Sequence, residues 1–414
     1  MIYSPRPSKP GRTGTPGPGH ERGVRMKEQA RLGWERIKWA GAHMPLHAEI
    51  RRRFAREKPL SGQRIGVALH LEAKTANLIL TLHAGGAELF VVGSNPLSTQ
   101  DPIVQALAEV EGITVAARHG ESEEERLRNI DLLLAFPPTL IVEDGGDVAW
   151  RLSERGDWEG LLGICEETTT GVERLQALHQ AGKLPVPAIA VNDAKMKHLF
   201  DNRYGTGQSS WDAIMRATNL LVAGKTVLIV GYGWCGKGLA LRAQGLGARV
   251  LVAEIDPVKA VEAAMEGYTL VELAEGMEQA DFVVTATGQP GVIDEAALRH
   301  AKHGQILANA GHFGYEIDRA ALERLAREAF PARAGVTGFR FPDGRTVYLL
   351  GEGELVNLAL GDGHPVEIMD ISFALQSLSA EYLVREGGRL SPGVYPVPQD
   401  IDQGVAELVL HWLR

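Results

Sequence analysis

The chain has 414 residues, of which 44% are hydrophobic and 23% are charged, and its formal net charge at pH 7 is -9. This length predicts two or three domains, and the composition is ordinary for a soluble α/β protein. The acidic balance argues against a nucleic-acid-binding surface, and no apolar run has the roughly 20 residues that a membrane span needs. Cys165 and Cys235 lack CxxC spacing, so we expect no disulfide framework, no metal site and a cytoplasmic location.

The predicted elements follow a leader. Residues 1–25 contain five prolines and five glycines and no apolar signal segment, and we expect them to be disordered. Met26 opens a helical pattern. From residue 64 onward, β-branched runs alternate with amphipathic helical patterns, and the expected strands are "RIGVAL", "ELFVVGS", "ITVAA" and "TLIVEDGG".

A second alternating series begins at residue 226, with expected strands in "TVLIV", "RVLVAEI", "DFVVTAT" and "QILANAG". Alternation of this kind predicts an α/β fold with two doubly wound parallel sheets. Residues 339–350, "FRFPDGRTVYLL", predict two strands around a turn. The chain ends in a predicted amphipathic helix with Val405, Leu408, Val409 and Leu413 on one stripe.

The stretch "VLIVGYGWCGKG" predicts a dinucleotide-binding turn. Gly231, Gly233 and Gly236 follow a strand and precede a helix, and Glu254 ends the next strand. The first glycine permits the tight turn, the second lets the backbone approach a pyrophosphate, and the third allows close helix packing. Glu254 can accept hydrogen bonds from ribose hydroxyls and would repel a 2′-phosphate, which favours NAD over NADP. We expect Lys237 to be a solvated helix residue rather than a phosphate ligand.

Titratable side chains also follow strands of the first series. His70 comes after "RIGVAL", Asp144 lies in "VEDGGD", and Glu167 follows "LLGIC". Each alone is an ordinary cap or turn residue, but ligands in open α/β sheets bind beyond the carboxyl ends of strands. We therefore expect the three groups to converge on one crevice.

The stretch "VNDAKMKHLFDN" presents an amine, a carboxylate and an amide. If it is helical, Lys197 and Asp201 stand at i and i+4, with Asn202 beside them. Such a pair is by default a surface salt bridge. In a closed cleft it could instead hold and deprotonate a sugar hydroxyl while hydride leaves.

Six blocks carry a resemblance to a known family: "EETTTG", "VNDAKMKHLFDNRYGTGQS", "GYGWCGKG", "EIDPVKAVEAAMEGY", "NAGHF" and "GELVNLALGDGHP". In this order they resemble the S-adenosyl-L-homocysteine hydrolase (adenosylhomocysteinase) family over essentially all of residues 26–405. The resemblance implies a redox-neutral hydrolysis in which tightly held NAD oxidises the ribose 3′-hydroxyl and later returns the hydride. The temporary ketone acidifies C4′, so homocysteine thiolate leaves C5′ and water adds.

The resemblance also implies roles for individual residues. Lys197 and Asp201 match the pair that handles the 3′-hydroxyl, Glu167 matches the ribose-binding glutamate, and Asp144 and His70 match the proton-transfer groups at C4′ and C5′. His312 resembles the histidine near the ribose and nicotinamide. The remaining matches are the cofactor contacts Thr168, Thr169, Thr170, Asn202 and Asn357, and the hinge-loop residue His364 over the purine.

Departures from the family concern the purine and the tail. The chain reads "HLEAKT", with Glu72 and Lys74 where better-known members have Thr and Glu. Lys74 can only donate, which suits a 6-keto purine, so S-inosylhomocysteine is an alternative substrate; the other interpretation is an ion pair with Glu72. Thr206 replaces a frequent cysteine. The chain also stops before the lysine- and tyrosine-bearing tail of longer members, which places it in a short-tailed branch.

The resemblance implies a domain plan and partners. Residues 26–205 form the substrate-binding domain, completed by about 361–395, residues 206–360 form the Rossmann NAD-binding domain, and residues 396–414 form a C-terminal helix with a possible part in dimer packing. The expected partners are the small-molecule substrate and further copies in a homotetramer or dimer. Two rivals remain: a true NAD-dependent dehydrogenase, which would release NADH, and a nucleotide-sensing relative without turnover.

Overall fold

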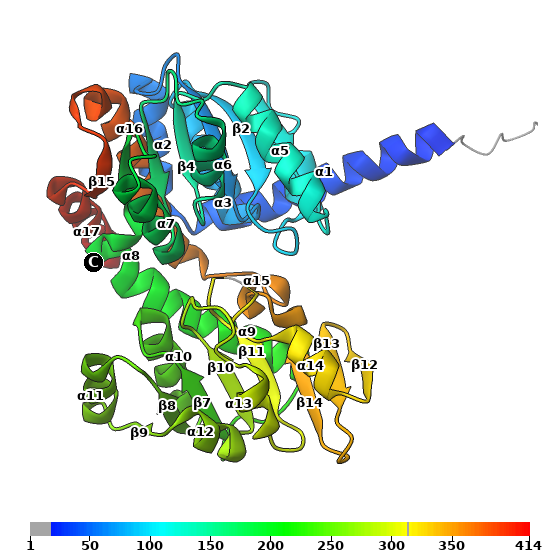
Figure 1. Ribbon diagram of the computed structural model, residues 1–414. Helices are drawn as coiled ribbons and strands as arrows, with labels where there is room; N and C mark the ends of the chain where they lie inside the picture. The colour runs from blue at the N-terminus through cyan, green and yellow to red at the C-terminus, as the bar shows by residue number, and fades with distance from the viewer. Residues whose placement is uncertain (1–17, 313) are drawn as a thin grey trace, which may run out of the picture.

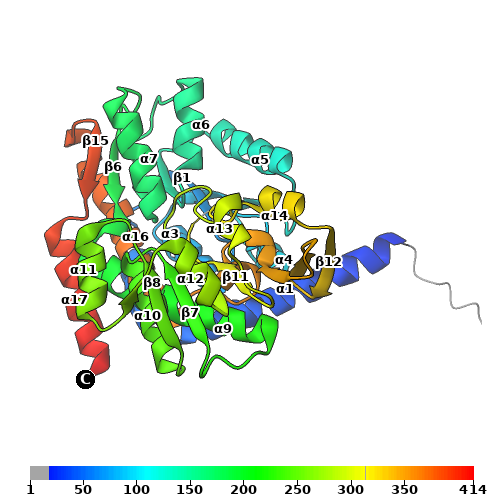
Figure 2. The ribbon, with the colours of Figure 1, turned by 60° about the horizontal axis from the view of Figure 1, so that its bottom comes forward.

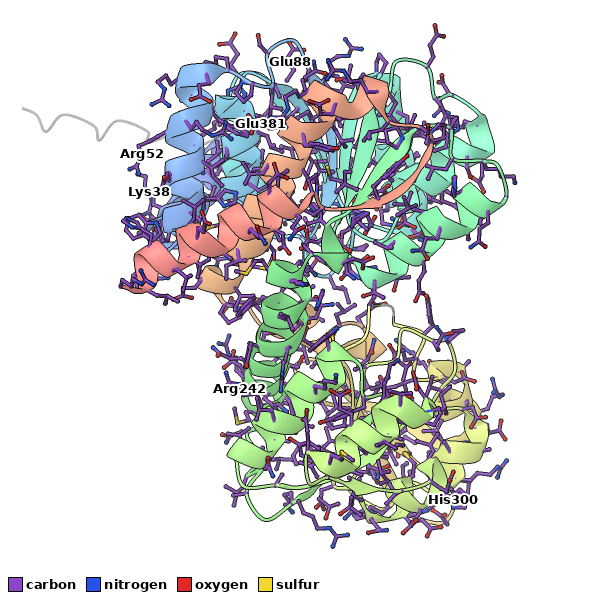
Figure 3. All side chains as sticks on the ribbon, turned by 90° about the vertical axis from the view of Figure 1, so that its left-hand side faces the viewer. Lys38, Arg52, Glu88, Arg242, His300 and Glu381 are labelled. Carbon is purple, nitrogen blue, oxygen red and sulfur yellow. The ribbon has the colours of Figure 1, made fainter. Side chains whose placement is uncertain are left out.

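The computed structural model describes residues 18–312 and 314–414, which form two lobes with one sheet each (Figure 1). The turned view brings the second lobe forward (Figure 2). The prediction of an α/β protein with two doubly wound parallel sheets is confirmed. Acidic and basic side chains are interspersed on the outer surface, as the labelled Lys38, Arg52, Glu88, Arg242, His300 and Glu381 illustrate (Figure 3).

The first sheet has seven parallel strands in the order β15-β6-β5-β4-β1-β2-β3. The strands are β1 (Arg64–Leu69), β2 (Glu88–Gly93), β3 (Ile113–Ala116), β4 (Leu140–Glu143), β5 (Gly163–Glu166), β6 (Pro187–Ala190) and β15 (Gly393–Pro396). Successive side chains of a strand point to opposite faces, so Ile65 and Val67 join one apolar core and Ala68 joins another. Both faces are therefore covered.

The helices that cover the first sheet divide between these two cores. One core takes side chains from α1 (Pro18–Ala42), α2 (Pro45–Glu57), α3 (Ala73–Ala84), α4 (Asp101–Leu107), α16 (Val366–Glu386) and α17 (Gln399–Leu413). The other takes them from α5 (Glu123–Ala135), α6 (Asp147–Arg155) and α7 (Thr169–Gln180). The C-terminal segment thus packs on the N-terminal half of the chain.

The second sheet has eight strands in the order β12-β13-β14-β11-β10-β7-β8-β9. They are β7 (Thr226–Val230), β8 (Arg249–Ala253), β9 (Thr269–Leu270), β10 (Phe282–Thr285), β11 (Ile306–Asn309), β12 (Glu328–Arg333), β13 (Val336–Arg340) and β14 (Thr346–Leu350). Strands β13 and β14 form the predicted antiparallel pair, with Phe339 opposite Val347. Its cores take side chains from α9 (Thr206–Thr218), α10 (Trp234–Gly245) and α11 (Pro257–Met265) on one face, and from α12 (Leu273–Gln279), α13 (Glu295–Arg299) and α14 (Arg319–Leu325) on the other.

Short helical pieces connect the lobes. After β6 the chain runs through η1 (Val191–Asp193), α8 (Lys195–Lys197) and the π-helix η2 (His198–Gly205) into α9. It returns through η3 (Gly351–Gly353), α15 (Val356–Ala359) and residues 360–365 to α16, and η4 (Gly387–Arg389) precedes β15. The first connection starts at the carboxyl end of β6, and the return connection meets it there, since His364 lies 3.3 Å from Asp201.

The leader prediction is wrong in part. Residues 18–25 are helical and continue directly into the helix that the sequence predicted from Met26, while residues 1–17 lie outside the described residues. Extending an existing helix costs much less than nucleating one, and a proline is tolerated in the first turn. Strands β6, β9, β12 and β15 were not predicted either.

The C-terminal helix is confirmed over Gln399–Leu413. Of its predicted apolar stripe, Val405 is fully buried and Leu408 and Val409 pack partly against the first core, whereas Leu413 is 77% exposed. No helix within residues 18–312 and 314–414 is long and apolar enough to cross a membrane.

Candidate active site

The predicted site residues meet between the lobes, at the carboxyl ends of β1, β4 and β5. His70 follows β1, Asp144 follows β4, and Glu167 follows β5. These three strands are neighbours in the order β5-β4-β1, so their ends open on one crevice. The convergence that the sequence predicted is present.

Asp144 lies between two histidines, one from each lobe. Its Oδ2 is 3.4 Å from Nε2 of His70, and its Oδ1 is 3.5 Å from Nε2 of His312. Burial raises the pKa of Asp144, although the nearby His312 and Lys197 act to lower it. Burial also lowers the pKa of His70 to about 4 and lowers that of His312. Near neutral pH both imidazoles are therefore neutral and available as proton acceptors.

The tautomer of His70 follows from its other nitrogen. Nδ1 lies 2.7 Å from Oγ of Ser98, and that hydroxyl donates to the carbonyl oxygen of Asn95 at 3.0 Å. Because a serine hydroxyl has one proton, it accepts from the Nδ1–H of His70. Nε2 is then the unprotonated nitrogen, and it faces Asp144.

Lys197 is the centre of a second cluster. Its Nζ donates to Oδ1 of Asn202 at 2.9 Å, and lies 3.1 Å from Oδ1 of Asp201 and 3.7 Å from Oε1 of Glu167. Burial disfavours its charge, but Asp201 and Glu167 outweigh burial and hold the pKa of Lys197 above its usual value. Burial likewise opposes the charge of Asp201, yet Lys197 and His364 hold the pKa of Asp201 well below its usual range.

The local helix is a π-helix rather than the α-helix assumed for the i, i+4 pairing. Its wider turn lets Lys197 contact Asn202 at i+5 as well as Asp201 at i+4. π-Helical turns are rare in proteins, and those that do occur are often found at functional sites. The sequence carries no signal that distinguishes the two helix types here.

Two residues on α16 that the sequence did not single out hold these carboxylates. Ser372 donates to Oδ2 of Asp201 at 2.7 Å, and Nε2 of Gln376 donates to Oε2 of Glu167 at 2.5 Å. Burial raises the pKa of Glu167 to about 7, although the charge of Lys197 acts to lower it. A signal existed: Ser372 and Gln376 are spaced i, i+4 in a helix whose side chains are otherwise mostly apolar.

The glycine turn fits a dinucleotide on structural grounds. Gly231 has φ +93°, a Cβ on Gly236 would lie 1.9 Å from the carbonyl oxygen of Gly231, and a Cβ on Gly233 would meet no atom within 4 Å. Gly231 and Gly236 are thus required by the fold, while Gly233 borders open space where a pyrophosphate can approach. Glu254 ends beside the turn, with Oε2 accepting the amide of Tyr232 at 2.6 Å.

Lys237 differs from its prediction. It is 7% exposed rather than solvated, because its Nζ pairs with Oε1 of Glu262 at 2.6 Å and lies 4.3 Å from the ring centroid of Trp234. These contacts turn its amine away from the role of a phosphate ligand.

The predicted cofactor threonines have unlike surroundings. Thr168 caps α7 and donates to Oε1 of Glu166 at 2.8 Å, so its hydroxyl is committed inside the first lobe. Thr169 is the first residue of α7, and Oγ1 of Thr170 would lie 3.9 Å from a Cβ on Gly288 of the second lobe. Thr170 thus lies close to the backbone of the opposite lobe.

The hinge residues are tied into the site. Nδ1 of His364 lies 3.3 Å from Oδ1 of Asp201, and its Nε2 lies 3.2 Å from Oγ1 of Thr206. Asn357 is buried and donates to Oγ of Ser209 at 3.1 Å. Thr206 thus contacts the hinge loop directly.

Lys74 connects the first lobe to the same loop. Its Nζ pairs with Oε2 of Glu72 at 3.0 Å and donates to the carbonyl oxygen of Asp362 at 2.6 Å, and its side chain is 6% exposed. An ammonium has three N–H donors, so one remains for a further acceptor. The ion pair with Glu72 that the sequence allowed is present.

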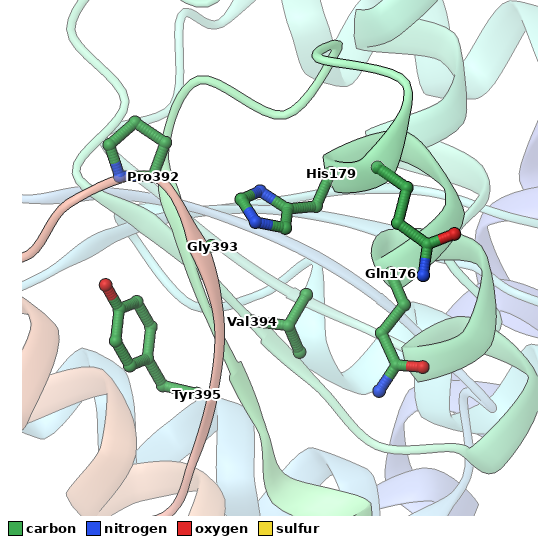
Figure 4. Close-up of a pocket in the computed structure, with 7 residues that line it drawn as sticks. Gln176, His179, Pro392, Gly393, Val394 and Tyr395 are labelled. Atoms are coloured by element: carbon green, nitrogen blue, oxygen red, sulfur yellow. The ribbon is translucent and has the colours of Figure 1, made fainter.

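Two further observations concern metal binding and a cavity away from the site. Within the described part of the chain, no group of three His, Cys, Asp or Glu side chains is arranged to hold a metal ion. A cavity of about 310 Å³ lies between the last turn of α7 and the start of β15, where His179 and Gly393 line it (Figure 4). This is the amino end of the strands, opposite to the site.

Comparison with known proteins assigns the family. Residues 22–159 match the family described as S-adenosyl-L-homocysteine hydrolase, and residues 202–363 match its NAD binding domain. The chain is 54% identical over 393 residues to the S-inosyl-L-homocysteine hydrolase of Methanopyrus kandleri, covering 94% of this chain and 92% of that protein. The chain belongs to the S-adenosyl-L-homocysteine hydrolase family. It is therefore an enzyme of this family with an NAD-binding domain.

Other relatives are named adenosylhomocysteinase. The chain is 54% identical over 380 residues to the adenosylhomocysteinase of Thermotoga maritima, covering 91% of this chain and 94% of that protein. It is 51% identical over 380 residues to the adenosylhomocysteinase of Pyrococcus abyssi, with coverage of 91% and 90%. The relatives at about 50% identity are thus divided between an adenosyl and an inosyl substrate.

Proposed function

We propose that the protein hydrolyses S-adenosyl-L-homocysteine to adenosine and L-homocysteine through transient oxidation at the ribose 3′ position. The observation that carries the proposal is the pair of clusters described above: Lys197 with Asp201 and Glu167 on one side, and Asp144 between His70 and His312 on the other. The NAD that the second lobe fits would supply the hydride acceptor. The chain's own residues then have separate tasks.

Lys197 and Asp201 would bind the 3′-hydroxyl. The Lys197 ammonium and the Asp201 carboxylate are 3.1 Å apart and buried, so a hydroxyl that contacts both can accept from Lys197 and donate its proton to Asp201 without solvent. Ser372 keeps Asp201 in place, and Asn202 keeps Lys197 in place. Glu167, held by Gln376, is placed to bind the ribose hydroxyls.

Asp144 and His70 would move the protons at C4′ and C5′. The carboxylate of Asp144 takes the C4′ proton once the neighbouring ketone has acidified it, and the raised pKa of Asp144 favours the protonated state that results. The unprotonated Nε2 of His70, 3.4 Å from Oδ2, can receive that proton and pass it to the departing sulfur. His312 flanks Asp144 from the second lobe, next to the expected nicotinamide.

We propose the following division of the chain on the same basis. Residues 26–205 with 361–395 bind the substrate, residues 206–360 bind NAD through Gly231, Gly233, Gly236, Glu254 and Asn357, and Thr168, Thr169 and Thr170 approach the cofactor from the first lobe. Closure of the lobes excludes water while the ketone exists. The protein would work in the cytoplasm as a homotetramer or dimer, with the helix 396–414 in the subunit contact.

Hydrolysis of S-inosyl-L-homocysteine to inosine is the second candidate, and Lys74 favours it. The buried Lys74 ammonium contacts the hinge loop, which also carries His364. Its remaining N–H can donate to a purine 6-oxygen. An adenine 6-amino group would need an acceptor there instead. Glu72, beside Lys74, offers such an acceptor, although Lys74 already occupies its Oε2.

Paired steady-state kinetics test both candidates. Homocysteine release would be measured from the adenosyl and inosyl substrates on one NAD-saturated preparation, for the wild type and Lys74→Met. The adenosyl candidate predicts the larger kcat/KM for the adenosyl substrate. A preference for the inosyl substrate that Lys74→Met removes would establish the second candidate, and release of NADH in proportion to product would overturn both.

A further inference from the structure

Two buried glutamates that the proposed reaction does not use lie directly behind the site. Glu143 ends β4 and Glu166 ends β5, the two residues are opposite each other in the sheet register, and both are 0% exposed. The residues that follow them, Asp144 and Glu167, are site residues. Neighbouring strands are about 4.8 Å apart, so two carboxyl groups stand side by side one residue behind the chemistry.

Glu166 binds the turn that carries Asp144. Its Oε1 accepts the amide of Gly145 at 2.9 Å, the amide of Thr168 at 2.9 Å and the Thr168 hydroxyl at 2.8 Å. The Thr168 hydroxyl in turn accepts the amides of Gly145 and Gly171, both at 3.1 Å. A Cβ on Gly171 would lie 2.0 Å from Cδ of Glu166, so the carboxyl is seated directly on the backbone of α7.

The position of Gly145 decides how the two lobes meet. Gly145 has φ +93°, and a Cβ added to it would lie 2.8 Å from Nε2 of His312. The same histidine nitrogen is 3.5 Å from Oδ1 of the adjacent Asp144. Arg174 donates to the carbonyl oxygen of Gly145 at 2.7 Å, so Glu166 and Arg174 hold the two peptide groups on either side of the Gly145 Cα.

We propose that Glu166 is a positioning residue, which holds the Asp144–Gly145 turn against His312 and so keeps Asp144 in line with the C4′ proton. The inference rests on the proposed function, because it concerns the proton transfer assigned to Asp144. A misplacement of about 1 Å in such a group costs roughly a hundredfold in rate. Glu166 acts through the backbone and does not contact the substrate.

The chemistry of the carboxyl group indicates which substitution preserves the role. Burial, together with the charges of Glu143 and Asp144, raises the pKa of Glu166 well above its usual value. All three donors converge on one oxygen, whereas Oε2 has no hydrogen-bond partner within the described residues. A neutral acid and an amide both offer one carbonyl oxygen, so glutamine can reproduce these contacts.

The test separates two partial reactions of the NAD-saturated enzyme, with adenosine and inosine as probes. The rate of 3′-oxidation is read from the absorbance of the reduced nicotinamide after rapid mixing. The rate of C4′ proton exchange is read from deuterium uptake into the recovered nucleoside in D₂O. We expect E166A to lower the ratio of exchange to oxidation by about tenfold or more, and E166Q to leave it within about threefold of the wild type.

Two further variants keep the test decisive. T168V keeps the side-chain shape but removes the hydroxyl that accepts the Gly145 amide together with Glu166. It should lower the same ratio even if E166A does not fold. E143Q is the matched control, since Glu143 accepts the amides of Val148 and Ala149 instead, at 2.8 and 3.2 Å, and should leave the ratio unchanged.

The outcomes distinguish the inference from its premise. An equal loss of both rates in E166A or T168V, or a loss in E166Q as large as in E166A, would overturn the positioning role of Glu166. A wild-type enzyme that oxidises neither nucleoside would instead overturn the proposed function.

Discussion

Removal of the Lys197 amine is the most direct perturbation of the proposed chemistry. In Lys197→Ala, the Nζ contacts with Asn202 at 2.9 Å, Asp201 at 3.1 Å and Glu167 at 3.7 Å are lost together. Two buried carboxyl groups then face each other without a cation, so the pKa of each should rise. The variant should nevertheless bind NAD, because Lys197 lies on α8 and the glycine turn lies between β7 and α10.

The expected magnitude follows from the task of Lys197. A positioned general acid or base contributes roughly 10²- to 10⁴-fold, which corresponds to about 3 to 5 kcal/mol in activation free energy. We expect 3′-oxidation to slow by that factor. The assay is rapid mixing of substrate with NAD-saturated enzyme, followed through the absorbance of the reduced nicotinamide, with NAD content measured separately after denaturation.

Lys195→Ala is the matched control, because Lys195 is exposed two residues earlier on the same short helix. It should oxidise substrate at the wild-type rate. If Lys197→Ala also does so with full NAD content, the assignment of Lys197 to the 3′-hydroxyl is refuted.

Two other predictions concern the cofactor turn and a buried acid. Gly233→Ala should weaken NAD binding without lowering the melting temperature of the NAD-free protein. Gly236→Ala should lower that melting temperature, because its Cβ would lie 1.9 Å from the Gly231 carbonyl oxygen. Equal effects of both variants on the NAD-free protein would contradict this prediction. Burial raises the pKa of Glu143 from 4.5 to about 8, so the folded state binds the proton more tightly. The stability linked to that proton is present below about pH 4.5 and is lost as the pH rises to about 8, and Glu143→Gln should flatten this decline in denaturant titrations; an unchanged pH slope would count against it.

The strand pattern predicted most of the fold. In β1 and β4, every residue of "RIGVAL" and "LIVE" after the first arginine is buried, as expected for strands covered on both faces. Besides β9, which has only two residues, the missed strands have weaker patterns: β6 is "PAIA", β15 is "GVYP" and β12 is "EAFPAR". Their proline and alanine content does not signal a strand, and they form at sheet positions that only the packed neighbours provide.

The site was predicted to a similar extent. His70, Asp144 and Glu167 were found because parallel strands end at one edge, and the glycine turn was found because only glycine fits a left-handed φ and a close backbone approach. Ser372, Gln376 and Ser98 were missed because their partners Asp201, Glu167 and His70 are distant in the sequence. Glu166 was missed because its carboxyl group binds the amide of Gly145, which follows a different strand. The i, i+4 spacing of Ser372 and Gln376 indicates two polar groups on one helix face, but it does not indicate which carboxylates they contact.

The sequence by itself determined the two-sheet α/β fold, the strand-end residues, the cofactor turn and, through its motifs, the family. Only the tertiary structure decided that Lys74 binds the hinge loop, that Lys197 at the end of α8 reaches both Asp201 and Asn202 in the π-helix that follows, and that Asp144 lies between histidines of two lobes. The physical reason is that strand and turn formation depend on short-range periodicity and backbone sterics. The protonation and direction of a buried side chain depend instead on which distant groups share its low-dielectric surroundings.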